Sequence, residues 1–571
     1  MRSQSATVVG STAGTLLQTS AWFSSLTSML TNGPAATIGG LLRERADDDA
    51  PALLTGDGSW SYRELVEEGF RRAALFEEMR DPDRPPHVGV LLDNVPDYLF
   101  WLAAGALAGT VVVGINSTYR GGQLAQLIDH TDCQVLVTSS DLAGLLEDSE
   151  SSVTPDRVLL VDDEDDIDRV ASMPAHDDHC RPGADDLYLL IFTSGSTGLP
   201  KAVRCTQGRM RRTGAHVAAI AEHADGDVVY APLPFFHAAS LFTGWAGALH
   251  AGIPIATRAR FSASGTVPDI RAFGATFLCY TGKVLNYILS TDEAPDDAEI
   301  PLRLAIGNEA SEHDIRDFAR RFGCQVRDSY GSTEGMVIVR RDAAMPAGSL
   351  GAGDDGVEVI DPETGRECPA AQFDDRGRVV NLEQAIGEIV QTRPATDFEG
   401  YYNNAAATRE RFRDGAYWSG DLAYRDPDGW LYFAGRSNEW LRVDGENFAA
   451  APVEAIIARH ADVRSVAVYA VPDDPVGDRV MAALELRTGA HFDRGEFDVF
   501  LRSQPDLGSK WIPSFVRVDA ALPYLSSMKI DKRLLRREAW RPDGVVWRPS
   551  RHADLQPLSP EERRELAPLL P

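Results

Sequence analysis

The sequence predicts an α/β fold with a large, multi-sheet N-terminal domain and a smaller α+β C-terminal domain. Three observations lead to this prediction. The chain has 571 residues, more than a single hydrophobic core usually serves, so two or more domains are expected. From Thr37 onward, strand-like apolar runs alternate with helical segments, which is typical of a largely parallel, covered sheet. A compact second group of strand and helix signals follows after residue 450.

The elements of the N-terminal part follow from its apolar pattern. Residues 58–65 predict a strand end and then a helix, with Ser61 as cap and Glu64 three residues later. The apolar segment 96–107 predicts another helix. Strands are predicted at residues 88–92, 111–115, 134–138, 157–161 and 187–192. Residues 162–186 are acidic, and we expect them to form a linker loop before the last of these strands.

The C-terminal part has its own pattern. Residues 466–471 and 480–486 predict paired strands around the turn 472–477. Helices are predicted on either side, at 452–460 and 494–503. The tail after Trp547 is rich in proline and charge, and we expect it to be loosely held.

The first 36 residues differ from the rest, because Arg2 is their only charged side chain. We expect a disordered extension, or a true start at Met29. A secretory signal is the less favoured alternative, since polar residues interrupt the apolar stretch.

Composition and charge bound the function. The chain is 44% hydrophobic and 25% charged, as in soluble globular proteins, and no apolar run approaches the roughly 18–20 residues that span a bilayer. A net charge of -29 argues against nucleic acid or an anionic membrane as a general partner. The six scattered cysteines form no Cys-x-x-Cys pair, which fits a reducing cytosol. We therefore expect a cytoplasmic protein whose membrane contact is at most peripheral.

The most informative stretch is the loop after the strand at 187–192. Its two glycines let backbone N–H groups converge on one anion, while hydroxyls and a lysine add donors and charge. It is not a Walker loop, because Leu199 and Pro200 separate the last glycine from the lysine, and Ala202 follows. We predict that the loop binds phosphate through Thr193, Ser194, Gly195, Ser196, Thr197, Gly198 and Lys201.

The turn 330–335 combines an aromatic ring, a hydroxyl and a carboxylate. Tyr330, next to Gly331, is suited to stacking on a base. Thr333 is suited to hydrogen-bonding a phosphoryl or carboxylate oxygen, and Glu334 to holding Mg²⁺.

Three later motifs add further polar groups. Asp421, in the segment 417–422, can accept hydrogen bonds from both hydroxyls of a ribose. Arg436 follows a strand-like segment and suits ribose or phosphate. Lys529 lies on a polar turn near the far end of the chain. Each motif alone is weak, and their order along the chain is what makes them informative.

Taken in this order, the motifs resemble those of acyl-adenylate-forming enzymes, the acyl-CoA synthetase and luciferase superfamily. The resemblance covers residues 37–537. Within it, residues 260–264, 280–283 with Tyr287, Gly307-Asn308 and 444–448 resemble the fatty acid transport protein and very-long-chain acyl-CoA synthetase branch. The resemblance implies that a carboxylic acid (a long- or very-long-chain fatty acid, or a steroid side chain) attacks the α-phosphate of ATP. The thiol of CoA then displaces AMP, so ATP, Mg²⁺ and CoA are expected.

The resemblance also implies roles for individual residues. The loop and Lys201 would hold the β- and γ-phosphates, and Thr197 and Glu334 would support Mg²⁺. Lys529 would bridge the carboxylate and the α-phosphate in the transition state. His237 matches the family's gate beside the acyl carboxylate, although a core histidine stays open as the alternative.

The C-terminal domain is implied to be mobile, rotating about a hinge at Asn438 and bringing Gly445 toward the CoA channel. The expected organisation is an extension 1–36, an AMP- and acyl-binding domain 37–437, a mobile domain 438–547 and a tail 548–571.

Three residues depart from the family pattern. Asn438 is neutral at the hinge, and Met528 stands where glycine commonly precedes the lysine. Glu309 follows Gly307-Asn308 where a small residue is usual. A carboxylate there would repel that of the substrate, unless it points away or pairs with a cation.

Other functions stay open at this point. An acyl-AMP ligase that loads a carrier protein differs from a CoA ligase in the second half-reaction. An amino-acid-activating domain would need an acidic pocket residue, and residues 238–242 offer none. A non-catalytic fatty acid uptake or binding protein would keep the fold alone. The sequence leaves a homodimer open.

Overall fold

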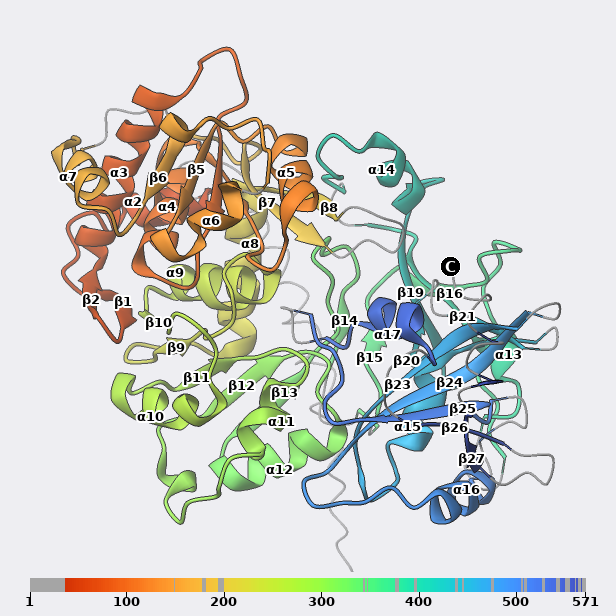
Figure 1. Ribbon diagram of the computed structural model, residues 1–571. Helices are drawn as coiled ribbons and strands as arrows, with labels where there is room; N and C mark the ends of the chain where they lie inside the picture. The colour runs from red at the N-terminus through yellow and green to blue at the C-terminus, as the bar shows by residue number, and fades with distance from the viewer. Residues whose placement is uncertain are drawn as a thin grey trace, which may run out of the picture. The chain divides into compact units, whose positions relative to one another are not determined.

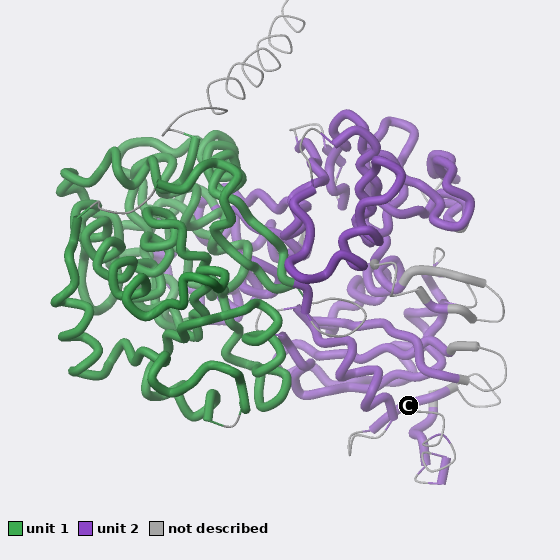
Figure 2. Tube along the Cα trace, turned by 90° about the horizontal axis from the view of Figure 1, so that it is seen from above, with its two compact units in different colours: residues 1–193, 202–279, 300–304 green, residues 194–201, 280–299, 305–571 purple. Residues whose placement is uncertain are grey.

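A computed structural model gives the fold of the chain (Figure 1). It describes residues 36–571 except 148, 177–180, 194–199, 342–344, 347, 375–378, 395–397, 437–439, 444–445, 474–476, 505–506, 508–510, 526–528, 541–544, 550–554, 560, 563–565 and 567–571. The chain divides into two compact units, coloured separately in Figure 2. Unit 1 contains residues up to 193, 202–279 and 300–304, and unit 2 contains 194–201, 280–299 and 305–571.

Unit 1 contains a six-stranded sheet in the order β6-β5-β3-β4-β7-β8. The pairs that β3 forms with β4 and β5 are parallel, as are β4 with β7 and β5 with β6. The strands β3, β4 and β5 are buried along their whole length, as expected of a covered parallel sheet. The strands are β3 (His87–Leu91), β4 (Val111–Gly114), β5 (Val135–Thr138), β6 (Val158–Leu160), β7 (Leu187–Thr193) and β8 (Lys201–Thr206). Each predicted strand of this part is therefore confirmed.

The predicted capping box at the start of helix α3 (Tyr62–Met79) is present. The backbone N–H of Glu64 donates to Ser61 Oγ at 3.2 Å, and the backbone N–H of Ser61 donates to Glu64 Oε2 at 2.7 Å. Helix α4 (Pro96–Ala108), also predicted, packs against α3. The other helices of unit 1 are α2 (Ile38–Arg43), α5 (Gly121–His130), α6 (Ser140–Glu147), η2 (Pro155–Arg157), α7 (Glu164–Ser172), α8 (Gln207–Ala221), the π-helix η3 (Ser240–Ala246), α9 (Gly247–Ala251) and α10 (Ala263–Phe273).

The acidic segment 162–186 is not simply a linker, because it contains helix α7. Asp163 caps this helix by accepting from the backbone N–H groups of Asp165 and Asp166. Acidic residues in a first turn favour a helix because they face its positive end. The acidic run that suggested a linker is therefore a helix start.

A second sheet of unit 1 contains strands in the order β11-β9-β10-β1-β2. Its strands are β1 (Pro51–Thr55), β2 (Gly58–Ser61), β9 (Val229–Tyr230), β10 (Ile255–Ala256) and β11 (Phe277–Cys279). The segment after β9 is fixed by the buried side chain of Asn94, which donates to Leu233 O at 2.8 Å and accepts from Phe235 N at 3.1 Å. This segment carries His237.

Unit 2 contains an antiparallel sheet in the order β14-β15-β20-β19-β17-β16, with β18 paired to β19. Its strands are β14 (Val339–Arg340), β15 (Gly351–Gly353), β16 (Val357–Ile360), β17 (Gly387–Gln391), β18 (Phe412–Arg413), β19 (Ala416–Arg425) and β20 (Trp430–Arg436). Two further strands are β12 (Leu304–Gly307) and β13 (Gln325–Asp328). The helical elements before and within this part are α11 (Val284–Leu289), η4 (Asp297–Glu299), α12 (Glu312–Phe322), α13 (Leu382–Ala385) and α14 (Ala405–Arg411).

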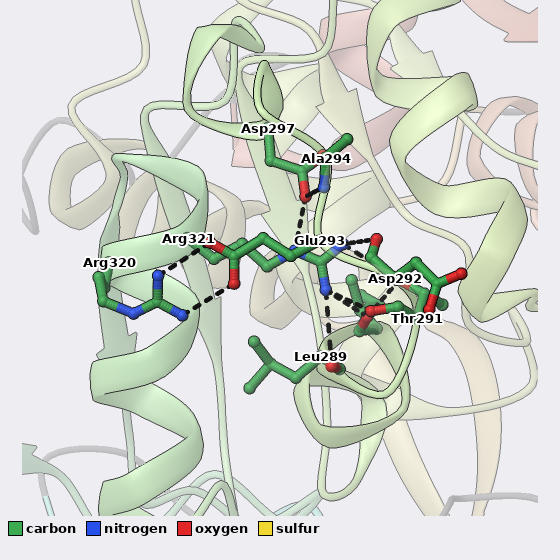
Figure 3. Close-up of polar contacts among 9 residues, drawn as sticks. Leu289, Thr291, Asp292, Glu293, Ala294, Asp297, Arg320 and Arg321 are labelled. Atoms are coloured by element: carbon green, nitrogen blue, oxygen red, sulfur yellow. Dashed lines mark hydrogen bonds and ion pairs between the residues drawn. The ribbon is translucent and has the colours of Figure 1, made fainter.

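A buried arginine ties α12 to the segment after α11, as Figure 3 shows. The guanidinium of Arg321 donates to Asp297 Oδ2 at 2.6 Å, to Thr291 O at 2.8 Å and to Asp292 O at 2.7 Å. A cavity of about 460 Å³ lies beside it, lined by Glu293, Ala294, Pro295, Ala298, Arg320 and Arg321. None of the residues predicted for function lines this cavity, so we interpret the cluster as structural.

The predicted C-terminal strand pair is confirmed as the antiparallel pair β23 (Val463–Asp473) and β24 (Gly477–Leu486). They belong to a five-stranded sheet in the order β23-β24-β25-β26-β27. Alternate residues of β23 enter two cores: Val468 packs with α15 (Ala450–Ile457) and α16 (Arg494–Ser503), whereas Ala467 and Tyr469 pack with Leu535 of α17 (Lys532–Glu538). The remaining elements are β21 (Trp440–Val443), β22 (Glu446–Ala449), α15 (Ala450–Ile457), α16 (Arg494–Ser503), β25 (Phe515–Asp519), α17 (Lys532–Glu538), β26 (Val546–Pro549) and β27 (Leu555–Pro557).

The tail after Trp547 is not loosely held at its start. Strand β26 pairs with both β25 and β27, so Pro549 and Pro557 belong to paired strands. Pro549 is the last residue of β26, and Pro557 is the last residue of β27. Among the described residues, no helix is long and apolar enough to cross a membrane.

Candidate active site

The structure describes both ends of the predicted phosphate loop. Thr193 is the last residue of β7 and Lys201 is the first of β8. Ser194, Gly195, Ser196, Thr197 and Gly198 lie outside the described residues, as do Asn438, Gly445 and Met528. Predictions about these positions therefore stay predictions.

Lys201 is a buried member of a polar network in unit 2. Its side chain is 8% exposed, and its Nζ lies 3.6 Å from Glu410 Oε2. The same Nζ lies 5.3 Å from the centre of the Tyr401 ring, a cation–π distance. The hydroxyl of Tyr401 in turn donates to Glu334 Oε1 at 2.7 Å. The tyrosine ring thus joins two residues that the sequence predicted for phosphate and Mg²⁺.

Burial raises the pKa of Tyr401 well above its usual value, and the negative charge of Glu334 raises it further. The phenol therefore stays protonated at physiological pH and remains a donor to the Glu334 carboxylate. This donor fixes one oxygen of the carboxylate that we predicted to hold Mg²⁺.

Arg411, at the end of α14, adds a second cation to this region. Its Nη1 lies 3.8 Å from Glu388 Oε1 and donates to Trp418 O at 3.4 Å. Glu388 also accepts from the backbone N–H of Gly420 at 2.6 Å, yet burial raises its pKa. Gly420 has a φ of +75°, and a Cβ there would lie 2.0 Å from Arg411 Nη1. A residue other than glycine would therefore be strained by the positive φ, and its Cβ would require the Arg411 side chain to move.

The structure brings Asp421 and Tyr330 into contact. The Tyr330 hydroxyl donates to Asp421 Oδ2 at 2.7 Å, and the backbone N–H of Asp421 donates to Ser419 Oγ at 3.1 Å. Burial raises the pKa of the Tyr330 phenol well above its usual value, and the charge of Asp421 raises it further. Asp421 of β19 also stands opposite Arg436 of β20 in the strand register.

Tyr417 links the two halves of this cluster. Burial raises the pKa of its phenol far above the usual value, and the charge of Glu334 adds to the rise. Its neighbours also include Tyr401, Arg411 and Tyr330. Lys201, Glu334, Tyr330 and Asp421, which span 221 positions of the sequence from 201 to 421, therefore share one network.

The turn 330–335 is held by a hydrogen bond from Gly335 N to Ser332 O at 3.0 Å. Thr333 is half-buried within it. A Cβ on Gly331 would meet nothing within 4 Å, so the backbone there borders open space. This is the arrangement expected of a turn over which a ligand can lie.

The turn after β12 is fixed on both sides of Glu309. Gly307 O accepts from Ser329 N at 2.7 Å, and Asn308 O accepts from Gly282 N at 2.7 Å. Ala310 N donates to Asp328 Oδ2 at 2.9 Å. These bonds hold Glu309 at a φ of +64°, in the left-handed region that side chains other than glycine rarely adopt.

Two groups beside this turn are unusual. The side-chain Oδ1 of Asn308 is buried and has no hydrogen-bond partner among the described residues. Asp328 also accepts from the Tyr280 hydroxyl at 2.9 Å, but burial raises the pKa of its carboxyl to about 6. A buried acceptor without a donor is uncommon in proteins and is often met by a ligand or water.

Lys529 points its charge at the same turn. Its Nζ donates to Glu309 Oε1 at 2.5 Å, and the two side chains are 32% and 45% exposed. The backbone of Lys529 is anchored through its carbonyl, which accepts from Leu525 N at 2.8 Å. The sequence predicted that Glu309 would repel the substrate carboxylate unless it points away or pairs with a cation. The structure shows that it pairs with a cation, Lys529.

His237 belongs to unit 1. Its backbone N–H donates to Pro234 O at 3.1 Å, and its ring lies 4.5 Å from that of Phe236 between centroids. The ring is half-buried, which leaves both the gate and the core alternative open.

The residues present are compatible with Mg²⁺. This ion prefers one or two carboxylates together with phosphate oxygens and water, and Glu334 supplies one carboxylate. In the part of the chain that the structure describes, no group of three or more His, Cys, Asp or Glu side chains is arranged to hold a metal by itself.

Sequence reasoning missed Tyr401, Arg411, Glu388 and Glu410. The run Arg409-Glu410-Arg411 looks like an ordinary solvated helix end, and no local pattern distinguishes it. Its position beside Lys201 is a contact between residues more than 200 positions apart, through Glu410.

Two family models match the chain and cover most of it. The model for the AMP-binding enzyme matches residues 42–402, and the model for the AMP-binding enzyme C-terminal domain matches residues 452–529. The chain belongs to the AMP-binding enzyme family. The predicted superfamily is thereby confirmed.

Relatives place this AMP-binding enzyme among CoA ligases. The steroid-22-oyl-CoA synthetase of Rhodococcus jostii (strain RHA1) is 44% identical over 515 residues, covering 90% of this chain and 93% of the relative. The medium/long-chain-fatty-acid–CoA ligase FadD17 of Mycobacterium tuberculosis is also 44% identical, covering 90% of this chain and 98% of the relative. ATP-bound MatB from Rhodopseudomonas palustris has the same fold, with a TM-score of 0.75 at 24% identity, covering 88% of this chain and 98% of MatB.

These findings confirm the predicted α/β fold with its smaller C-terminal domain, and the assignment of the chain as an adenylate-forming CoA ligase. The roles of individual residues and the domain boundary at 437/438 stay predictions.

Proposed function

We propose that the enzyme joins a bulky, hydrophobic carboxylic acid to CoA through an acyl-AMP intermediate. The observation that carries the nucleotide half of this proposal is the network of Lys201, Tyr401 and Glu334. The acid half rests on the two relatives at 44% identity, one named for a steroid acyl group and one for medium- and long-chain fatty acids. Both names describe acids with large apolar bodies.

In the first half-reaction, a carboxylate oxygen of the acid attacks the α-phosphorus of ATP. The bond from this phosphorus to the bridging oxygen of pyrophosphate breaks, which gives acyl-AMP. The acid is a weak nucleophile and the triphosphate is densely anionic, so positioning and charge neutralisation do most of the catalysis. In the second half-reaction, the thiolate of CoA attacks the acyl carbon and AMP leaves.

The geometry suggests which groups serve each part of ATP. Lys201 neutralises the β- and γ-phosphates together with the loop 194–198 and Thr193. Tyr330 lies against the base, and Asp421 with Arg436 receives the ribose. Glu334 and Thr197 would hold Mg²⁺ together with phosphate oxygens, and the ion would supply charge neutralisation there.

The remaining groups act on the acid and on the site as a whole. Lys529 contacts the attacking carboxylate and the α-phosphate, with Thr333 as a further donor. His237 borders the acyl carboxylate. Arg411, missed from sequence, keeps Glu388 and Glu334 in a positive environment, and Asn308 Oδ1 offers an acceptor to a donor of the bound nucleotide.

The proposal is tested by measuring ATP-dependent AMP release across medium-chain, long-chain, very-long-chain and steroid carboxylates, each with and without CoA. We expect acyl-CoA formation with at least one of these classes. Inactivity across the whole panel would contradict the proposed substrate class. Stable acyl-AMP that CoA does not discharge would instead favour the ligase that loads a carrier protein.

A pair of variants, each of which removes one lysine charge, tests the role proposed for Lys201 in binding ATP. Lys201→Met is expected to raise the KM for ATP about tenfold, because a charge-assisted contact to phosphate is lost. The matched control is Lys532→Met, which removes a lysine paired with Glu454 at 2.9 Å. An equal effect in both variants would show that net charge, and not the position of Lys201, sets the KM.

We further propose a cytoplasmic enzyme with no nucleic-acid partner. The five described cysteines are free thiols, all buried, which supports a reducing compartment. We propose that membrane contact is at most peripheral, which flotation with anionic vesicles tests. We also propose a homodimer, which sedimentation tests.

A further inference from the structure

The contact between Glu309 and Lys529 has no role in the mechanism above. It joins residues 220 positions apart, so it is not a local helix or turn pair. We propose that Glu309 is a built-in placeholder for the substrate: its carboxylate occupies Lys529 in the acid-free enzyme, and the incoming acid displaces it. This inference rests on the proposed function.

The chemistry of the two partners is the first argument. Lys529 is the group proposed to contact the carboxylate of the acid, and it already holds a carboxylate at 2.5 Å. Glu309 therefore offers the same functional group that the substrate brings. Two carboxylates close to one ammonium repel each other, so Glu309 and the acid compete for Lys529.

The fixed turn is the second argument. Hydrogen bonds at Gly307, Asn308 and Ala310 hold the backbone on both sides of Glu309. They keep Glu309 at a φ of +64°, although a non-glycine residue resists this conformation. The turn therefore presents the carboxylate in one place, and Lys529, on its flexible four-carbon stem, is the partner that moves.

The exposure of the pair is the third argument. Both side chains are about one third or more exposed to solvent, at 32% and 45%. A partly exposed ion pair is weak, so a substrate carboxylate can displace Glu309 with only a small loss of affinity. The placeholder keeps Lys529 near its working position without blocking it strongly.

The decisive variant is Glu309→Gln, which keeps the shape of the side chain but removes its charge. We expect the KM for the acid to fall about two- to fivefold, which is the size of effect that a partly exposed pair allows. The KM for ATP and the kcat are expected to stay within about twofold of wild type, because the competition concerns the acid alone.

Two further variants protect this test from trivial explanations. Glu309→Gly suits the positive φ, so it is expected to fold and to lower the KM for the acid in the same way. Glu293→Gln is the matched control, since Glu293 forms an exposed pair with Arg320 at 3.0 Å in the same unit. This control is expected to leave the KM for the acid unchanged.

A readout without turnover completes the experiment. An amine-selective acylating reagent, followed by digestion and mass spectrometry, reports how accessible the Lys529 amine is. We expect Glu309→Gln to label faster at Lys529 than wild type, and Glu293→Gln to label at the wild-type rate. A saturating fatty acid is expected to protect Lys529 in wild type and in both variants.

The outcomes separate the two proposals. If wild type is active and neither Glu309 variant lowers the KM for the acid, the placeholder is wrong while the proposed function stands. A fall in kcat without a change in KM would also overturn it, because Glu309 would then assist the transition state. If wild type is inactive on every acid, the proposed substrate class fails, and the labelling rates of Lys529 still decide whether the pair exists.

Discussion

Two of the cation–carboxylate pairs of unit 2, Arg321 with Asp297 and Lys529 with Glu309, differ in burial and in the number of groups that the cation contacts. Arg321 and Asp297 are 3% and 4% exposed, and the arginine also donates to several backbone carbonyls of residues 288–292. Lys529 and Glu309 are partly exposed, and the Lys529 ammonium contacts a carboxylate that a turn with a positive φ carries. The first pair is buried, and its arginine is hydrogen-bonded to several acceptors. In the second pair, a ligand carboxylate can replace Glu309 at the lysine.

The difference teaches how to separate a structural pair from a functional one. A guanidinium surrounded by carbonyls cannot move without leaving those carbonyls unpaired, so it suits a clamp. An ammonium on a flexible stem that meets one carboxylate can change partners at little cost. Four predictions test this contrast, from the largest expected effect to the smallest.

Removing the clamp should affect folding most. Arg321→Ala leaves Asp297 buried without its cation, and we expect the free energy of unfolding to fall by about 3–5 kcal/mol. Urea denaturation at pH 7 measures this loss. Arg320→Ala, which removes the neighbouring exposed pair with Glu293, should cost about 0–1 kcal/mol. Equal losses in the two variants would remove the distinction between enclosed and open pairs.

Removing the other cation should affect chemistry and not folding. Lys529→Ala is expected to lower the rate of acyl-AMP formation about 10²–10³-fold, the usual effect of losing one donor to the transition state. Acid-dependent exchange of labelled pyrophosphate into ATP measures this step. The free energy of unfolding should change by less than about 1 kcal/mol. A rate near that of Lys532→Met would contradict the role given to Lys529.

The free energy of unfolding should also depend on pH through the turn that carries Glu309. Burial raises the pKa of Asp328 from 3.8 to about 6, so the folded state binds its proton more tightly than the unfolded state does. The stabilisation from this proton is complete below about pH 4 and is lost as the pH rises through about 6. It is of the order of 2–3 kcal/mol at 1.36 kcal/mol per pKa unit.

Asp328→Asn tests this sign. Asparagine keeps an acceptor for Ala310 N and the Tyr280 hydroxyl but cannot ionise. Compared with wild type, the variant should therefore lose less stability between pH 4.5 and pH 7, measured by urea denaturation at both values. A pH dependence as steep as that of wild type would show that Asp328 does not titrate in this range.

Local features of the fold could be predicted from sequence, and distant contacts could not. Ser61 and Glu64 form their capping box within four residues, and the spacing alone indicates it. Helix α7 was missed because an acidic run serves equally well as a linker or as a helix start. Strands β26 and β27 were missed because a segment rich in proline and charge looks like a loose tail. Their pairing with the sheet is visible only in the structure.

The site divides in the same way. Lys201, Tyr330, Glu334, Asp421 and Lys529 were chosen from motif chemistry, and the first four lie in one network. The partners that tune them were not foreseen, because contacts such as that of Tyr401 with Glu334 join residues 67 positions apart. Glu309 was recognised as a departure from the family pattern. Its cationic partner, Lys529, lies 220 positions away, and no local pattern predicts that contact.

The smallest predicted effect concerns the backbone beneath Glu309. Glu309→Gly should leave the free energy of unfolding within about 0.5 kcal/mol of wild type, because relief of the positive φ offsets the greater freedom of glycine in the unfolded chain. Asp297→Gly, at the enclosed pair, should cost several times more. Urea denaturation of both variants measures the contrast. A large loss for Glu309→Gly would mean that the carboxylate at this turn is structural, and the two pairs would then belong to one class.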